Sequence, residues 1–177
     1  QILNEQPESL LAHSGAKEVL IELNSLSKSH NMAGWRIGWL CGAPSYINTI
    51  LKVKSNMDSG MYKPMQLAAA EALQASKEWL DNQQQRYQAR KTAVQELLDL
   101  LGCGYAASQK GMFVWASLHA GEQDAEAFAE RLLSEARVFM PPGTVFGPAG
   151  EGYIRASLCV PVVRIVEAIE RIKKWKI

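Results

Sequence analysis

A long stripe of apolar residues at helical spacing runs through the middle of this 177-residue chain and constrains its fold more than any other feature. The members of the stripe recur at intervals of seven and then of three or four residues: Leu80, Tyr87, Val94, Leu97, Leu98 and Leu101. This spacing places them on one face of a helix. Gly102 follows directly and favours a helix end, because glycine tolerates the backbone conformation common there. The helix separates two parts of the chain whose patterns differ.

The N-terminal part shows short apolar runs between turn signals. We interpret residues 18–23 as a buried strand, of the kind found in a parallel sheet that is covered on both faces. Residues 36–41 predict a second strand, and Ser45 is expected to cap the helix that follows it. Residues 58–60 signal a turn, and residues 65–75 again favour a helix.

The C-terminal part alternates strands and helices. Its predicted strands occupy residues 111–118, 137–140 and 152–159. Asp124 is expected to cap a helix, whose apolar face consists of Phe128, Leu132, Leu133 and Ala136. Pro161 suits the first turn of a final helix, whose inward side chains are expected to be Ile165, Val166, Ile169 and Ile172.

These patterns together predict a chain of the α/β class with three parts. Residues 1–60 form the edge of one α/β domain, residues 61–76 form a helical connection, and residues 77–177 form a small α+β domain. The apolar share of 47% is large enough to supply a sizeable core.

The charge pattern argues against several kinds of partner. The net charge is only +1, and acidic and basic residues are interleaved, so no basic stripe suggests nucleic acid. No apolar run approaches the roughly 18 residues that a membrane helix needs. We therefore expect neither nucleic acid nor a membrane as a partner, and the spacing of the cysteines favours no metal site.

The three cysteines are Cys41, Cys103 and Cys159. They are far apart and lie among apolar residues, which favours buried free thiols. Free thiols fit a reducing compartment, so we expect a cytoplasmic protein. The chain opens at Gln1 with no signal-peptide pattern, and we expect it to be part of a longer protein.

The stretch SLSKSHNMAGWRIGW, residues 25–39, carries the groups that a phosphate-bearing aldehyde cofactor requires. Lys28 offers an amine that can form an imine, Arg36 offers a fork of donors that suits phosphate, and Ser25 and Ser27 add hydroxyls. Gly34 and Gly38 are expected to allow close backbone approach beside Arg36. By residue type alone, however, such a segment is more often an exposed loop.

The run Ser-x-Ser-Lys followed after seven residues by Arg-x-Gly resembles the cofactor-lysine signature of the class I/II pyridoxal-phosphate aminotransferases of fold type I. This resemblance implies that Lys28 is the catalytic lysine and bonds covalently to pyridoxal 5'-phosphate. It also implies that Ser25 and Arg36 bind the cofactor phosphate, with Ser27 a weaker candidate for the same task.

Two further segments resemble the same family. In GTVFGPAGEGYIRAS, residues 143–157, Arg155 matches the arginine that binds the substrate carboxylate, although residue type alone favours pairing with a surface acid. In GMFVWA, Phe113 and Trp115 match the strand that lines the substrate entrance, and core packing is expected for at least one of them. The loop at residues 58–60 matches a segment at the family's dimer interface.

The resemblance extends over the whole chain and implies transfer of an amino group between an amino acid and a 2-oxo acid by a homodimer. The family's glycine-rich cofactor loop, its substrate asparagine, and the aspartate and tyrosine that contact the cofactor ring normally lie upstream of such a segment. We therefore expect the 177-residue chain alone to be inactive. His30, two residues after Lys28, is expected to be a surface or supporting histidine, because no paired carboxylate is evident.

Two other classes of protein are compatible with the same residues. Some transcription regulators carry an aminotransferase-like domain that binds pyridoxal phosphate as an effector, and an upstream DNA-binding domain would identify that class. The chain could also be a structural fragment without catalytic function, since shared motifs speak of ancestry and site chemistry rather than of present activity.

Overall fold

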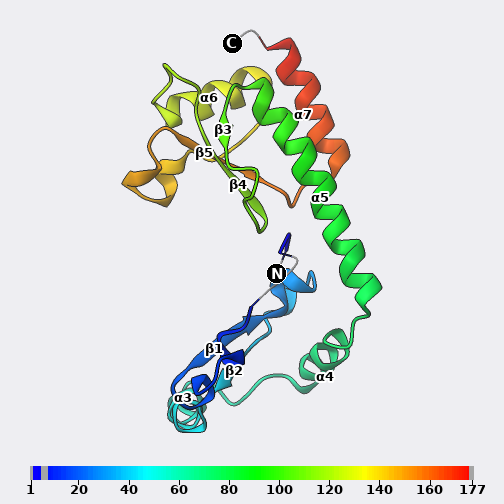
Figure 1. Ribbon diagram of the computed structural model, residues 1–177, viewed down its shortest axis with the longest axis vertical. Helices are drawn as coiled ribbons and strands as arrows, with labels where there is room; N and C mark the ends of the chain where they lie inside the picture. The colour runs from blue at the N-terminus through cyan, green and yellow to red at the C-terminus, as the bar shows by residue number, and fades with distance from the viewer. Residues whose placement is uncertain (1, 5–7, 176–177) are drawn as a thin grey trace. The chain divides into compact units, whose positions relative to one another are not determined.

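The computed structural model describes residues 2–4 and 8–175. Clustering of backbone contacts divides the chain into two compact units, coloured blue to green and green to red in Figure 1. Unit 1 is the stretch Leu3–Leu80, and unit 2 comprises Asp81–Ile177 together with Ile2. The boundary falls in the first turn of helix α5 (Lys77–Leu100).

Unit 1 contains a two-stranded antiparallel sheet. Strands β1 (Ile21–Ser25) and β2 (Gly38–Gly42) pair with Leu23 opposite Leu40. The prediction of a parallel sheet is wrong, because the connection between the strands holds only the short helices α2 (Leu26–Ser29) and η2 (Ala33–Trp35). This connection folds the chain back beside β1 instead of crossing over the sheet.

The boundaries of the predicted strands also shift. The short helices η1 (Leu10–Ala12) and α1 (Ala16–Val19) precede β1, so the start of the predicted 18–23 strand is helical. Gly15 has a left-handed backbone (φ 75°) at the start of α1. The apolar run is therefore divided between a helical turn and a strand, a division that hydrophobicity alone does not reveal.

Two helices complete unit 1. Helix α3 (Pro44–Met57) starts two residues earlier than predicted, because Pro44 occupies its first turn and Ala43 stands at the N-cap position in place of the expected Ser45. The chain bends at Ser59, as predicted, and helix α4 (Lys63–Ala72) follows. The buried centre of the unit is small and consists of Leu26, Ile37 and Ala69 with partly buried neighbours.

Unit 2 contains a three-stranded antiparallel sheet in the order β3 (Gly104–Tyr105), β4 (Phe113–Ser117), β5 (Tyr153–Ser157). Alternate residues of β4 and β5 lie on opposite faces of the sheet. The buried face carries Val114, Ala116, Ile154 and Ala156, and the other face carries Phe113, Trp115, Tyr153 and Arg155.

Three helices build the core of unit 2: α5, α6 (Ala125–Ala136) and α7 (Val162–Lys174). Asp124 caps α6 as predicted, and its carboxylate accepts a hydrogen bond from the Ala127 amide at 2.9 Å. Most residues of the predicted apolar faces are buried, but three are exposed: Leu80, Leu133 and Val166. They lie at the margins of their stripes, where a helix face turns toward solvent.

The predicted strand at residues 137–140 is not a strand. Its side chains alternate as a strand's would, with Val138 and Met140 buried and Phe139 exposed. Backbone pairing with β5 begins only further along the chain, where the Arg155 amide donates to the Pro141 carbonyl at 3.0 Å. The pattern of burial is present here without the ladder of hydrogen bonds that defines a strand.

Two loop helices, η3 (Gly143–Phe146) and η4 (Pro148–Gly150), lie close together before β5. Their glycines permit this contact, because a Cβ atom on Gly143 would lie 2.2 Å from the Gly150 carbonyl oxygen. The same Cβ would lie 2.9 Å from the Trp115 ring. The loop therefore approaches the sheet face that carries Trp115.

The cysteines occupy three different environments and are all free. Cys103 is buried, and burial raises the pKa of its thiol to about 11. Cys41 is half-buried and Cys159 is exposed, so the prediction of a buried thiol is wrong for Cys159, which lies just beyond the end of β5. Across the described residues, no helix has both the length and the apolar character that crossing a membrane requires.

Candidate active site

Ser25 is the last residue of β1 and the N-cap of α2. Its hydroxyl accepts a hydrogen bond from the Ser27 amide at 3.1 Å and donates one to the Ile37 carbonyl at 3.1 Å. The first bond stabilises the start of α2, and the second ties it to the residue that leads into β2. Ser25 therefore fixes the position from which Lys28 projects.

Lys28 is exposed, whereas Leu26 on the same helix is fully buried. Leu26 packs with Ile37 and Ala69 and so anchors α2 to the small core of unit 1. Within the described part of the chain, the Lys28 ammonium has no hydrogen-bond or ion-pair partner. Its amine is thus accessible and uncommitted, as a group that reacts with an aldehyde must be.

Arg36 has a left-handed backbone with φ of 53°, and Asn31 in the same connection has φ of 55°. Such conformations cost about 1–3 kcal/mol outside glycine and gather at functional sites. One guanidinium nitrogen of Arg36 donates to the Ala33 carbonyl at 3.1 Å, which leaves other donors of the fork available. A Cβ on Gly38 would lie 2.8 Å from the Asn24 oxygen, so close approach there is confirmed.

Gly34, the other glycine beside Arg36, lies in open space, because a Cβ atom at this position would meet no atom within 4 Å. No protein atom of the described residues makes a close approach at Gly34, so the expectation for this glycine stays a prediction. The two glycines differ because Gly38 is paired opposite Ser25 in the sheet, whereas Gly34 lies in the exposed helix η2.

His30 supports α2 through a contact that the sequence did not reveal. Its ring stacks on Trp79 at 5.7 Å between centroids and 15° between planes, and its Nδ1 atom lies 2.8 Å from the Ser29 hydroxyl. Burial lowers the pKa of the imidazole. Trp79 comes from the first turn of α5, far along the chain, and no local pattern signals the pair.

The donor set of this connection fits pyridoxal phosphate. A free primary amine suits the aldehyde, and a guanidinium with spare donors suits the phosphate. Lys28 and Arg36 supply these groups, and the half-buried Ser27 adds a hydroxyl. No group of three or more His, Cys, Asp or Glu side chains among the described residues could hold a metal ion.

Arg155 belongs to unit 2, on the sheet face of β5 opposite Trp115. Its Cζ atom lies 4.1 Å from the ring centroid of Phe113 and 4.1 Å from that of Phe146. No carboxylate of the described residues forms an ion pair with it, so the surface pairing considered from the sequence is absent there. Four of the five predicted site residues thus share one connection of unit 1, and the fifth lies in unit 2.

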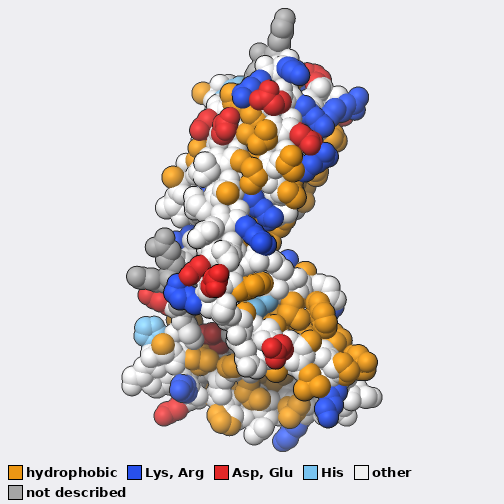
Figure 2. Space-filling model, turned by 90° about the vertical axis from the view of Figure 1, so that its right-hand side faces the viewer, with side chains coloured by type: hydrophobic (Ala, Val, Ile, Leu, Met, Phe, Trp, Pro, Cys, Tyr) orange, Lys and Arg blue, Asp and Glu red, His pale blue; other side chains and the backbone are white. Residues whose placement is uncertain are grey.

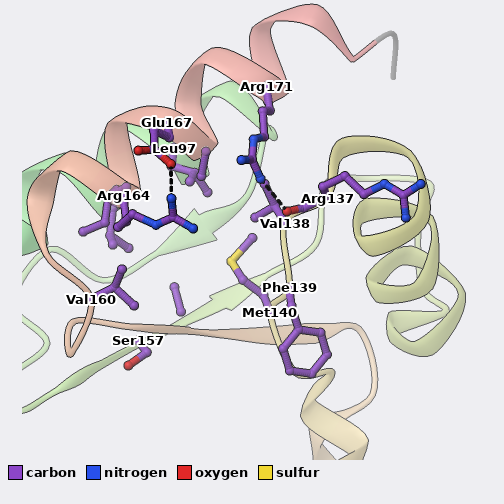
Figure 3. A pocket seen from close by; sticks show the side chains of 14 residues that line it. Leu97, Arg137, Val138, Phe139, Met140, Ser157, Val160, Arg164, Glu167 and Arg171 are labelled. Atoms are coloured by element: carbon purple, nitrogen blue, oxygen red, sulfur yellow. Dashed lines mark hydrogen bonds and ion pairs between the residues drawn. The ribbon is translucent and has the colours of Figure 1, made fainter.

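A separate cavity of about 230 Å³ lies between α5, α7 and residues 137–140 of unit 2, as Figure 3 shows. Apolar side chains such as Leu97 and Met140 line it. Arg164 pairs with Glu167 at 2.6 Å beside the cavity, and Arg171 donates to a backbone carbonyl at 3.0 Å. None of the five predicted site residues lines this cavity.

Comparison with known proteins identifies the family. The family model described as aminotransferase class I and II matches residues 4–172. The LL-diaminopimelate aminotransferase of Natranaerobius thermophilus is 42% identical over 170 residues, which cover 96% of this chain and 44% of that protein. The protein of the same name from Desulforudis audaxviator is 40% identical over 95% of this chain and 43% of its own length.

Solved structures agree with the sequence comparison. A probable N-succinyldiaminopimelate aminotransferase from Thermus thermophilus matches with a TM-score of 0.87 and 33% identity over 98% of this chain and 46% of that chain. An aromatic aminotransferase from Pyrococcus horikoshii matches with a TM-score of 0.84, 30% identity and coverage of 98% and 47%. The chain spans less than half the length of these relatives. It belongs to the class I and II aminotransferases, fold type I proteins that depend on pyridoxal phosphate.

Proposed function

We propose that the protein carrying this chain transfers an amino group between an amino acid and a 2-oxo acid with pyridoxal 5'-phosphate. The observation that carries the proposal is the exposed amine of Lys28, which has no partner among the described residues and is held by a capped helix in the same connection as Arg36. Membership of the family supplies the cofactor and the reaction class.

Each predicted site residue has a role in this proposal. Lys28 bonds to the cofactor aldehyde, and Arg36, Ser25 and Ser27 hold its phosphate. Arg155 binds the carboxylate of the substrate through the parallel donors of its guanidinium, a geometry that matches a planar anion.

Bound pyridoxal phosphate supplies an electron sink for the electrons released at the substrate α-carbon. Once the incoming amino acid has displaced it, Lys28 Nζ would take the proton from the substrate α-carbon and hold it as an ammonium group, ready to donate it again. Arg155 keeps the α-carbon in reach of that amine by fixing the carboxylate. Because the first substrate gives up its amino group and leaves before the second substrate binds at Arg155, the two substrates bind in turn, which predicts ping-pong kinetics.

The relatives' names make LL-diaminopimelate the first amino acid to assay. We further propose that residues 1–60 complete a large cofactor-binding domain, that residues 61–76 connect it, and that residues 77–177 form the small domain. A cytoplasmic homodimer fits the family, and exposed apolar side chains on α3 and α4 support a subunit interface there. The 177-residue chain alone is expected to be inactive.

The test uses the full-length protein that carries this chain. Pyridoxal phosphate is added, the absorbance spectrum is recorded, and borohydride reduction is followed by peptide mapping. We expect the label on Lys28 in the unaltered protein and at no single site in Lys28→Ala. Transfer from LL-diaminopimelate to 2-oxoglutarate should fall by at least about a thousandfold in Lys28→Ala, because both covalent attachment and proton transfer are lost.

A matched control is Lys17→Ala, which removes an exposed lysine of α1 from the same unit. It should leave both the label and the rate unchanged. Specific label on a lysine other than Lys28 would contradict the residue assignment. Label on Lys28 without transfer to any 2-oxo acid would contradict the reaction and favour an effector-binding domain instead.

A further inference from the structure

Two phenylalanine rings contact the Arg155 guanidinium, and both remain substantially exposed. Phe113 is 40% exposed and Phe146 is 48% exposed, so each ring presents part of its surface to solvent beside the guanidinium. Each ring centroid lies 4.1 Å from Cζ, well inside the range of about 6 Å over which a cation and an aromatic face attract.

The two rings come from separate parts of unit 2. Phe113 is the first residue of β4 and lies diagonally across the strand pair from Arg155, since the residue opposite Arg155 is Trp115. Phe146 comes from η3, a loop helix that begins at Gly143, where the chain makes a close contact with Gly150. The guanidinium is therefore held from the sheet and from the loop at once.

Trp115 contacts one of the two phenylalanine rings and so supports this arrangement. Its ring meets Phe146 edge-on, with centroids 5.8 Å apart at 71°, and stacks on Tyr153 at 5.5 Å and 19°. These contacts are of the kind that stabilise aromatic pairs. Phe146 is thus fixed on one side by Trp115 and on another by Arg155, which restricts where the guanidinium can point.

We propose that Phe113 and Phe146 form an aromatic clamp that positions Arg155 for the substrate carboxylate. Two rings within 4.1 Å of Cζ cover part of the guanidinium and displace water from the cation, which limits the directions in which its N–H groups can donate. A pre-oriented edge binds a carboxylate with less loss of side-chain entropy than a mobile arginine does. The clamp residues are positioning residues, and the proposal rests on the carboxylate role of Arg155 in the proposed function.

The first experiment measures kcat and KM for LL-diaminopimelate and 2-oxoglutarate in the full-length protein. Phe113→Leu and Phe146→Leu should each raise both KM values about threefold to tenfold, with kcat changed less than about twofold. Phe113→Tyr and Phe146→Tyr keep the ring and should stay within about twofold of the unaltered protein. Phe139→Leu, which alters an exposed phenylalanine beside the other cavity, is the matched control and should have no effect.

Arg155→Met separates the clamp from the proposed function. If Arg155→Met raises KM and the leucine variants do not, the clamp is wrong and the carboxylate role stands. If Arg155→Met leaves KM unchanged, the carboxylate role itself is wrong, and the clamp proposal falls with it.

A second readout needs no activity. Phenylglyoxal modifies arginine, and peptide mass spectrometry gives the rate at Arg155 alone. The clamp predicts at least about threefold faster modification in Phe113→Leu and Phe146→Leu than in the unaltered protein and in Phe139→Leu, because the guanidinium is less covered. Equal rates in all four proteins would overturn the proposal even if no transfer could be measured.

Discussion

The two units of this chain hold their candidate site residues by different means. In unit 1 the buried apolar residues are few: Leu26, Ile37, Ala43 and Ala69. In unit 2 a three-stranded sheet and three helices bury many more, and Phe128, Leu132 and Ile154 have no measurable exposure. A two-stranded sheet is of marginal stability by itself, whereas three strands covered by helices are not. Helix α2, which carries Lys28, is thus held by a small core and local hydrogen bonds, whereas strand β5, which carries Arg155, belongs to a sheet with an extensive core on its other face.

Both units expose large apolar side chains, including Phe139, Val163 and Val166 in unit 2, but unit 1 carries many of them on two consecutive helices. Helices α3 and α4 of unit 1 and the loop between them expose large apolar side chains: Tyr46, Ile50, Leu51, Val53, Met57, Met61, Tyr62 and Leu67. Figure 2 shows hydrophobic side chains gathered on the surface of this unit. In unit 2, helix α7 buries one regular face through Ile165, Ile169 and Ile172. Unit 1 therefore has apolar surface to offer to other protein segments, while α7 already uses its apolar face within the chain.

The largest expected effect is the loss of the core of unit 2. Phe128→Ala should lower the stability of this unit by about 3–5 kcal/mol, because it leaves a cavity among fully buried neighbours. Amide hydrogen exchange in the full-length protein measures the effect unit by unit. Amides of α6 and α7 should lose protection while those of β1 and β2 change by less than about 0.5 kcal/mol. Equal loss in both units would contradict their independence.

Gly42→Ala is expected to cause a smaller loss of stability, and in unit 1 instead of unit 2. Gly42 has φ of 145°, and a Cβ there would lie 2.1 Å from the Leu20 carbonyl oxygen. The substitution should cost about 2–3 kcal/mol, and the loss should be confined to β1, β2 and α2. Gly34→Ala has open space around its Cβ and should change the same amides by less than about 0.5 kcal/mol. Loss of protection in β4 and β5 would show that the units are coupled.

The smallest effect concerns pH and unit 1 alone. Burial lowers the pKa of His30 below its ordinary value of 6.5, so the folded state favours the neutral ring. The associated stability is present above pH 6.5 and is lost as pH falls toward the lowered pKa, where the unfolded state binds the extra proton first. His30→Phe keeps a ring to stack on Trp79 but cannot titrate. When the pH is lowered from about 7.5 to about 5.5, the Tm of the unaltered protein should fall further than that of this variant, by on the order of 1 °C. Parallel pH curves would contradict the assignment.

Much of the fold could be predicted from the sequence where a periodic pattern is long or where a capping residue marks the end of a helix. The α5 stripe, the Asp124 cap and the strands at residues 113–117 and 153–157 were predictable because period and capping chemistry are local properties. The pairing direction of β1 and β2 was not, because it depends on how the connection after Ser25 turns back. The stretch at 137–140 failed for a related reason, since alternating burial does not guarantee a hydrogen-bonded neighbour.

In the candidate site, too, local sequence features were predictable and contacts between distant segments were not. The residue types of the Lys28 segment point to an aldehyde and phosphate chemistry, and Lys28 and Arg36 are accessible enough for it. The contacts of Trp79 with His30 and of Phe146 with Arg155 were not predictable, because each joins segments whose proximity arises only in the folded chain. Lys91 was missed as well: it is 8% exposed and donates to the Ala107 and Gln109 carbonyls at 2.7 and 2.6 Å. A charged residue on a helix is ordinarily assumed to be solvated.

The Ser25 hydroxyl has a single proton, and the Ile37 carbonyl already receives it. A phosphate oxygen is also an acceptor, so binding one through Ser25 requires an exchange of partners in which the Ile37 carbonyl loses its bond. The net gain from Ser25 is then the difference between two hydrogen bonds and should be small. After this exchange the Ile37 carbonyl would keep only the bond that the Leu26 amide donates at 3.3 Å. Occupancy of the proposed phosphate site would then leave α2 tied to the approach to β2 by one hydrogen bond instead of two.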